Sequence, residues 1–283
     1  MKLILAKNSG FCNGVNYTIK ETLKLLEKGN VYCLGEIVHN ERVIENLKEK
    51  GLIIVDNILS VPDNSKVIIR AHGEKKETYE IAKNHNIEVI DLTCGKIKII
   101  KNKIKDKLSD YFIVIIGKHN HPETIGTISF SGKYSFIVEN DSDLDDLQEK
   151  VKKSNLNKLY IVAQTTFSNS GFDQLVNKIK ERFKNVDIMV DKTICLATEN
   201  RQKEIEELAN KVDKMIIVGS KHSSNANELF KIAKNNTKDV YLIDSKDDLV
   251  NIIFKENDIV GIASSASTSL DNVLEIVNYL ENY

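Results

Sequence analysis

Six continuous runs of apolar, mostly β-branched residues recur along the chain, two in each third. They are VYCLGEI, KVIIRAHG, YFIVIIG, KLYIVAQTT, KMIIVGS and DIVGIASS. Continuous apolar runs, as opposed to alternating ones, are typical of short parallel strands that are buried on both faces. A polar loop and then an amphipathic stretch follow each run. The pattern therefore predicts an α/β protein made of three repeats of one supersecondary unit.

Apolar residues at three- and four-residue spacing predict the helices. One stripe consists of Phe172, Leu175, Val176, Ile179 and Phe183, preceded by the candidate N-caps Ser168, Asn169 and Ser170. Three more stripes each follow a cysteine: Val15, Ile19, Leu23 and Leu26 follow Cys12, Ile97, Ile100, Ile104 and Leu108 follow Cys94, and Ile205, Leu208 and Val212 follow Cys195. We expect these cysteines at helix starts, where backbone N–H groups and the helix dipole stabilise a thiolate.

At 283 residues the chain is long enough for two or three modest domains. The repeat favours three, which we place at residues 1–94, with an N-terminal strand in this first domain, 95–193 and 194–283. Only Pro62 and Pro122 are prolines, and no low-complexity linker divides the thirds. We therefore expect three α/β domains that pack closely.

The formal net charge is −1, and lysines and acids are spread evenly along the predicted helix faces. This balance disfavours a nucleic-acid partner. The basic run KIKIIKNKIKDK has isoleucines at helical spacing, which favours a solvated amphipathic helix. The N-terminal MKLILAK is too short for the apolar part of a signal peptide, and no segment has the length of a membrane span. We expect a cytoplasmic protein without a membrane partner.

Three cysteines precede polar loop positions at matching distances. Cys12 is followed 27 residues later by His39, Cys94 is followed 27 later by His121, and Cys195 is followed 28 later by Ser223. A second set of positions repeats in the same way, with His72 60 residues after Cys12, Thr165 71 after Cys94 and Ser267 72 after Cys195. Such long separations in a reducing compartment favour metal binding or catalysis over disulfides. Cys33 lies inside an apolar run, and we expect it to be structural.

Cys12, Cys94 and Cys195 form no CxxC pair, so they do not resemble the ligands of a zinc ribbon or a ferredoxin. Thiolates from three domains suit a [4Fe–4S] cluster at the junction of those domains. With three protein ligands, such a cluster keeps one iron open for a substrate. A zinc site with three cysteines and a bound water is the alternative.

The polar positions at the predicted strand ends suggest an anion site. They are His39, His72, His121, Thr165, Thr166, Ser223, Ser224, Asn225 and Ser267. Neutral hydrogen-bond donors beside helix N-termini suit an anion with several oxygens, such as a diphosphate. There is no GxxxxGK[ST] loop and no strand-linked GxGxxG, which disfavours a nucleotide. Plain helix capping also explains the serines and threonines and is compatible with ligand binding.

In HNHPETIGT, Pro122 suits the first position of a helix and places Glu123 in the first turn. A first-turn glutamate is usually a surface residue that compensates the helix dipole. Beside an open metal site and an anion pocket, Glu123 is the obvious proton donor among these positions. We therefore expect it to act as a general acid.

Nine short motifs resemble, in order and spacing, the 4-hydroxy-3-methylbut-2-enyl diphosphate reductases, also called the IspH or LytB family. They are GFCNGV, the His39-Asn40 pair, RAHGE, DLTC, HPETIGT, AQTT, KTICLAT with NRQ, GSKHSSN and ASTS. The resemblance extends from Cys12 to about Leu270.

The resemblance implies a trefoil of three pseudo-threefold-related α/β domains around a central [4Fe–4S] cluster. The family's cluster ligands match Cys12, Cys94 and Cys195. The fourth iron of the cluster would bind the substrate hydroxyl. The family's diphosphate pocket matches His39, His72, His121, Ser223, Ser224, Asn225 and Ser267. Glu123 matches its proton-delivering carboxylate, and Thr165 or Thr166 the partner near the substrate hydroxyl. Electrons from ferredoxin or flavodoxin would remove that hydroxyl as water and give isopentenyl and dimethylallyl diphosphates, the last step of the non-mevalonate isoprenoid pathway.

The chain departs from the family pattern at several positions. Gly95 stands where the family commonly has proline, Asn16 and Tyr17 replace a frequent basic pair, and Ser265 and Ser269 replace a glycine and a proline. Three rival functions stay open: an iron–sulfur hydro-lyase, an iron–sulfur sensor that binds a phosphorylated metabolite, and a cysteine-dependent zinc hydrolase. Dependence on a reductant distinguishes the reductase from the hydro-lyase.

Overall fold

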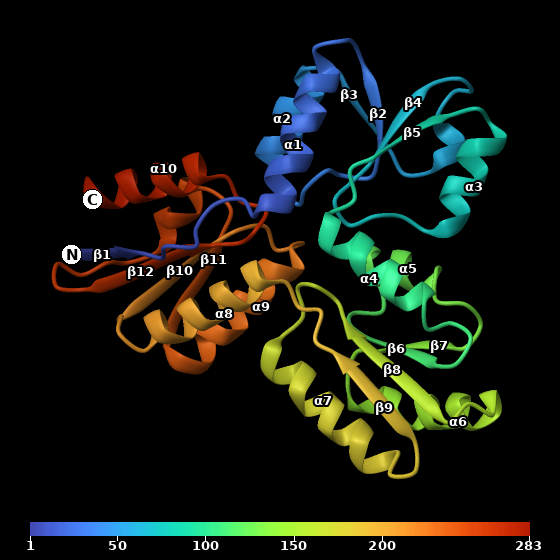
Figure 1. Cartoon of the computed structure of the whole chain (residues 1–283). Helices are drawn as coiled ribbons and strands as arrows, with labels where there is room; N and C mark the ends of the chain where they lie inside the picture. The colour runs from blue at the N-terminus through green and yellow to red at the C-terminus, as the bar shows by residue number, and fades with distance from the viewer. The chain divides into compact units, whose positions relative to one another are not determined.

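The computed structural model describes residues 1–283, which form three four-stranded sheets with helices between the strands (Figure 1). The strand orders are β3-β2-β4-β5 in the first sheet, β7-β6-β8-β9 in the second and β11-β10-β12-β1 in the third. Every pairing is parallel. The predicted α/β fold with three parallel sheets is confirmed.

The strands have the following bounds: β1 Lys2–Leu5, β2 Val31–Leu34, β3 Leu52–Val55, β4 Lys66–Ile69, β5 Glu88–Asp91, β6 Phe112–Ile116, β7 Ser135–Val138, β8 Lys158–Ala163, β9 Asp187–Asp191, β10 Lys214–Val218, β11 Asp239–Ile243 and β12 Ile259–Ser264. The α-helices are α1 Asn13–Leu26, α2 Glu41–Glu49, α3 Lys76–Asn84, α4 Gly95–Lys105, α5 Pro122–Ile128, α6 Leu144–Ser154, α7 Asn169–Arg182, α8 Leu196–Ala209, α9 Ser224–Asn236 and α10 Leu270–Glu281. Three short 3₁₀ helices, η1 Ile58–Ser60, η2 Asp141–Asp143 and η3 Lys246–Asn251, complete the order. None of the helices is both long and apolar enough to cross a membrane.

The six apolar runs are the two central strands of each sheet, as predicted. In the second sheet, every residue of β6 is buried, because helices cover both faces. Ile113 and Ile115 pack with Ile100 and Ile104 of α4, whereas Val114 and Ile116 pack with residues of α6 and α7. A strand covered on both sides has no reason to alternate in polarity.

The predicted helix of the Phe172 stripe is α7. Phe172, Leu175, Val176 and Ile179 are buried in the core of the second sheet. The side chain of Ser168 caps this helix by accepting a hydrogen bond from the Gly171 N–H at 3.2 Å. Cys12 directly precedes α1, and Cys94 and Cys195 are the N-cap residues of α4 and α8. The expected position of all three cysteines at helix starts is confirmed.

The chain forms two compact units. The C-terminal unit consists of residues 1–17, 38–45 and 195–283 and holds the third sheet. The central unit consists of residues 18–37 and 46–194 and holds the first and second sheets. β1 pairs with β12, from Lys2 beside Ile259 to Leu5 beside Ile262, so the N-terminal strand completes the third sheet and not the first domain. The domain limits 1–94, 95–193 and 194–283 otherwise stay a prediction.

Candidate functional site

The predicted polar positions lie where each sheet reverses its strand order. In each sheet the two central strands are neighbours. In the first two sheets the chain leaves them towards opposite edges, whereas in the third it leaves β10 towards β11 and the opposite edge is β1, which comes first in the sequence. Ligands of open parallel sheets bind beyond the carboxyl ends of the strands at such a reversal. The positions form three pairs: His39 and His72 follow β2 and β4, His121 and Thr165 follow β6 and β8, and Ser223 and Ser267 follow β10 and β12. Each cysteine follows the edge strand beside one pair.

In each sheet, a glycine directly follows the central strand that comes first in the sequence, at the start of the loop that leads to a polar position. Gly35, Gly117 and Gly219 each stand four residues before a polar position. A Cβ added at Gly117 would lie 2.8 Å from the Gln164 Cβ, and one at Gly219 would lie 2.8 Å from the Ser265 Oγ. These are closer than real Cβ atoms approach, so only glycine lets the neighbouring loop close in. These glycines were not predicted as part of the site, although their constant spacing before the polar positions could have revealed them.

Glu123 is the central acidic group of the central unit. It lies in the first turn of α5, is 3 % exposed, and its carboxylate accepts two hydrogen bonds from Thr165. The Thr165 N–H donates to Oε1 and the Thr165 hydroxyl donates to Oε2, both at 2.6 Å. Thr166 instead accepts a hydrogen bond from Gln164 at 2.8 Å. Of the two threonines, the structure pairs Thr165 with the predicted acid.

Burial raises the pKa of Glu123 to about 7. The two hydrogen bonds from Thr165 and the charge of Lys101 oppose this rise, because both favour the carboxylate. Glu123 is therefore not a surface residue of the kind that usually compensates a helix dipole. A buried carboxyl that titrates near neutral pH is suited to giving a proton to a bound substrate.

Two histidines lie beside this acid. His121 is the N-cap of α5, and its Nδ1 accepts a hydrogen bond from the Glu123 N–H at 3.2 Å. The ring of His72 meets the ring of His121 edge-on, with the centroids 5.4 Å apart. The central unit therefore brings His72, His121, Glu123 and Thr165 together.

The C-terminal unit gathers the serine and asparagine positions. Ser223 caps α9, and its hydroxyl accepts a hydrogen bond from the Ser267 hydroxyl at 3.5 Å. The Asn225 side-chain oxygen accepts from the Ala266 N–H at 2.9 Å. The Asn225 Nδ2 is buried and has no hydrogen-bond partner, so this donor is left for a bound group. Ser224 lies beside them at the start of α9 and is also buried.

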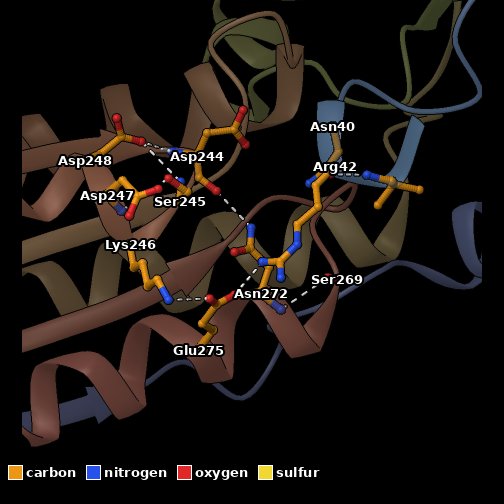
Figure 2. Close-up of polar contacts among 11 residues, drawn as sticks. Asn40, Arg42, Asp244, Ser245, Lys246, Asp247, Asp248, Ser269, Asn272 and Glu275 are labelled. Atoms are coloured by element: carbon orange, nitrogen blue, oxygen red, sulfur yellow. Dashed lines mark hydrogen bonds and ion pairs between the residues drawn. The ribbon is translucent and has the colours of Figure 1, made fainter. Parts of the chain in front are cut away.

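Figure 2 shows how the same unit holds the segment that carries His39. Asn40 caps α2 by accepting a hydrogen bond from the Val43 N–H at 3.0 Å. Arg42, in the first turn of α2, forms an ion pair with Glu275 of α10, and Lys246 binds the same carboxylate at 2.9 Å. We call Arg42, Glu275 and Lys246 the α10 clasp. No sequence motif indicated it, because Arg42 is more than 200 residues from the other two members.

The departures at Ser265 and Ser269 have local explanations. The Ser265 hydroxyl is buried and lies 3.0 Å from the Thr268 hydroxyl and 3.1 Å from that of Ser267. Ser269 caps α10 by accepting a hydrogen bond from the Asn272 N–H at 3.2 Å. Both serines therefore stabilise the loop that carries Ser267.

Two of the three candidate metal ligands share a buried cation. Cys12 and Cys195 both belong to the C-terminal unit, and both interact electrostatically with Arg201 of α8. The Arg201 guanidinium donates to the Gly10 carbonyl at 2.6 Å and to the Ala197 carbonyl at 3.2 Å, and its buried Nε has no partner. Arg201 is the arginine of the NRQ motif, and its position beside the two cysteines was not predicted from the sequence.

The cysteines have the chemistry of thiolate ligands. All three are partly exposed free thiols at helix starts, and the Val15 N–H donates to the Cys12 sulfur at 3.5 Å. These donors fit a thiolate-bound iron–sulfur group. No group of three or more His, Cys, Asp or Glu side chains lies together as a metal site. The complete ligand set therefore stays a prediction.

Cys33 has the structural environment that we expected. It is fully buried in β2, and burial raises the pKa of its thiol to about 12. Two of the histidines outside the pattern are paired near the surface, His85 with Asp63 at 3.0 Å and His119 with Asp143 at 3.1 Å. None of these groups belongs to the candidate site.

Comparison with known proteins gives a consistent result. The model of the family described as LytB protein matches residues 3–281. A 4-hydroxy-3-methylbut-2-enyl diphosphate reductase of Thermoanaerobacter sp. (strain X514) is 33% identical over 290 residues, which cover 99% of this chain and 98% of the relative.

Two solved structures are also similar. The E-1-hydroxy-2-methyl-but-2-enyl-4-diphosphate reductase from Plasmodium falciparum has a TM-score of 0.92 and 34% identity, covering 99% of this chain and 88% of that one. A structure described as (E)-4-hydroxy-3-methyl-but-2-enyl diphosphate reductase, the terminal enzyme of the non-mevalonate pathway, has a TM-score of 0.72 and 32% identity and covers both chains fully. Because the match extends over nearly the whole sequence and the whole fold, this chain belongs to the LytB family.

Proposed function

We propose that this chain is a 4-hydroxy-3-methylbut-2-enyl diphosphate reductase. It would convert the (E)-allylic alcohol to isopentenyl and dimethylallyl diphosphates, the last step of the non-mevalonate pathway. Membership of the LytB family supports this activity, and the names of the relatives describe the same substrate. The observation that carries the proposal is Glu123, a buried carboxyl with a pKa of about 7, held at both oxygens by Thr165.

The proposed diphosphate pocket consists of His39, His72, His121, Ser223, Ser224, Asn225 and Ser267. Hydroxyl, amide and imidazole groups can all donate hydrogen bonds to phosphate oxygens. The unpaired Asn225 Nδ2 supports this assignment, since a buried amide N–H without an acceptor is costly unless a ligand supplies one. Tight binding of the diphosphate would hold the allylic end of the substrate in a fixed place.

We propose a [4Fe–4S] cluster held by Cys12, Cys94 and Cys195, with one open iron. The LytB family is a family of iron–sulfur enzymes, and the three helix-start thiols are suitable donors. When bound, the cluster supplies the electrons of the reduction and a Lewis-acidic iron for the substrate hydroxyl. Ferredoxin or flavodoxin is the proposed electron donor.

The proposed proton donor is Glu123. Near neutral pH a large fraction of this carboxyl is protonated, because burial disfavours its charge. The proton allows the hydroxyl, which is a poor leaving group, to depart as water. After the transfer, the N–H and hydroxyl of Thr165 stabilise the carboxylate that remains.

An anaerobic assay tests this function. Reconstituted protein is mixed with 4-hydroxy-3-methylbut-2-enyl diphosphate and a reduced viologen dye, and iron and sulfide are measured on the same sample. We expect oxidation of the dye, both five-carbon diphosphates and about four irons per chain. Water addition or removal without a reductant would support a hydro-lyase. A full cluster without turnover would support a sensor, and bound zinc without iron would overturn the cofactor.

A further inference from the structure

Lys101 is a partly buried cation in the middle of α4, within the basic run that we expected to be a solvated helix face. Its ammonium donates a hydrogen bond to the Glu74 carbonyl at 3.2 Å and lies 4.3 Å from the centre of the Phe130 ring. A Cβ added at Gly73 would lie 3.1 Å from the Lys101 Nζ. The glycine of RAHGE thus leaves room for this side chain.

These contacts connect the loop after β4 with α5. A Cβ added at Gly126 of α5 would lie 3.2 Å from the Glu74 carbonyl oxygen, so the loop packs directly on the helix. Phe130 follows the end of α5, and its N–H donates to the Thr127 carbonyl at 3.1 Å. Lys101 therefore contacts both the loop that carries His72 and the segment that ends the helix of Glu123.

The charges around this ammonium define its role. Glu74, Asp91 and Glu123 attract it, whereas Lys98 of the same helix repels it. Burial is the larger influence and lowers the pKa of Lys101 to about 8, which still leaves it mainly charged at neutral pH. Lys101 is also the cation that favours the charged form of Glu123.

We propose that Lys101 is a positioning residue of the proton-delivery site. Its ammonium holds the His72–Glu74 loop on α5 and supplies the positive charge that stabilises the Glu123 carboxylate after proton transfer. The proposal rests on the proposed function, because it assigns Lys101 a part in the protonation step. Lys101 itself contacts neither substrate nor cofactor in this role.

The test compares Lys101→Met with Lys105→Met in the reconstituted holoenzyme. Methionine keeps the length of the side chain and removes the charge, and Lys105 is an exposed lysine one turn further along α4. Activity requires protonated Glu123, so kcat/KM is lost as pH rises through the pKa of that group. Without the ammonium, this pKa rises, and we expect the alkaline limb of the profile to move up by about half a pH unit, with a lower plateau. In Lys105→Met and Lys101→Arg, the alkaline limb of the kcat/KM profile should stay at its wild-type pH.

A second readout does not depend on turnover. The carboxyl band of Glu123 is followed by infrared titration and assigned by its absence in Glu123→Gln. We expect this band to titrate at higher pH in Lys101→Met, and in Lys101→Gln if the methionine variant does not fold. If Lys101 had a merely structural role, Lys101→Met would lower activity, but the alkaline limb of the kcat/KM profile and the titration of the infrared band would both stay at their wild-type pH. That result would overturn the proposal. If wild-type protein shows no reductase turnover, the proposed function fails, whereas the titration still decides the role of Lys101.

Discussion

Glu123 shows how opposing local forces set the chemistry of a single residue. Burial alone would keep its carboxyl neutral, whereas two hydrogen bonds from Thr165 and the charge of Lys101 favour the carboxylate. The balance places its pKa at about 7, so both the protonated and the charged form are populated at neutral pH. A proton donor needs this balance, because it has to hold the proton before the reaction and release it during the reaction.

Glu123→Gln is expected to lower kcat by about 100-fold or more, since glutamine cannot give up a proton. Glutamine has the same shape and can still pair with Thr165, so cluster content and substrate affinity should stay unchanged. The measurement is anaerobic turnover together with iron analysis and substrate binding. Glu77→Gln, an exposed first-turn acid of α3, is the matched control and should retain full activity. Full activity in Glu123→Gln would assign the proton to another donor.

Single residues were predictable where the neighbouring sequence decides their environment. Cys33 stands in an apolar run, and its burial followed from that run. The first-turn position of Glu123 was also correct, but its burial was not foreseen, because Thr165 is 42 residues away. Lys101 was assigned to a solvated face, since a helical spacing pattern does not reveal a loop that covers one lysine.

At the level of elements, helix starts carry most of the candidate chemistry. α4 is informative because Gly95 follows Cys94 at its first position. A Cβ at Gly95 would meet nothing within 4 Å. Cys94 has φ −53° and ψ 132°, an extended conformation that a following proline favours. Nothing in the local backbone therefore requires glycine at this position.

Gly95→Pro is expected to stabilise the protein by about 0.5–1 kcal/mol. Proline is suited to the first helical position and restricts the unfolded chain more than glycine does. The measurement is the free energy of unfolding in denaturant, with iron content as a check on the cluster. Gly117→Ala serves as a contrast, because its Cβ would collide with Gln164, and should destabilise. A loss of stability in Gly95→Pro would contradict this account of the helix start.

The α10 clasp is expected to influence substrate binding more than folding. Arg42 is exposed and Glu275 is partly exposed, so the ion pair itself contributes little to stability. It does hold the start of α2, directly after His39. We expect Glu275→Gln to weaken substrate binding several-fold, and high salt to reduce the difference from wild type.

Calorimetric titration at low and high salt measures the effect on binding. Glu149→Gln removes a comparable exposed pair with Lys153 on α6 and should leave the affinity unchanged. Equal affinities for wild type and Glu275→Gln at low salt would show that the clasp does not position His39.

The central strands were predictable and the edges of the sheets were not. β6 and β8 have continuous apolar sequences because helices cover both faces. β5 and β9 at the edges are only half-buried and mix polar with apolar residues, so they resemble loops in sequence. The place of β1 was missed for another reason: strand pairing over more than 250 residues leaves no local signal.

For the whole molecule, the repeat of polar positions after central strands was the most reliable guide. It predicted three sheets of one design, since each pair of central strands had to present equivalent loops. The repeat could not predict which sheet receives each terminal segment. Thus β1 joins the third sheet, and Cys12 belongs to the unit that holds it, although both precede the first sheet in the sequence.

The proposed ligand set takes its cysteines from both units of the chain. We expect Cys12→Ser, Cys94→Ser and Cys195→Ser each to lose most of the bound iron after anaerobic reconstitution, since serine is a poor ligand for this cluster type. Cys33→Ala should bind iron normally. Iron and sulfide per chain are the measured quantities. A serine variant that retains the full iron content would remove that cysteine from the ligand set.

The place of β1 also determines when Cys12 can acquire its final surroundings during synthesis. Its N–H donates to the Ala266 carbonyl at 3.1 Å, and the Gly10 N–H donates to the Ser264 hydroxyl at 2.8 Å. At about 5–20 residues per second, a ribosome needs roughly 15–60 seconds to reach these partners. The first cysteine to leave the ribosome is therefore the last to be positioned, and a truncated nascent chain would lack a stable place for it.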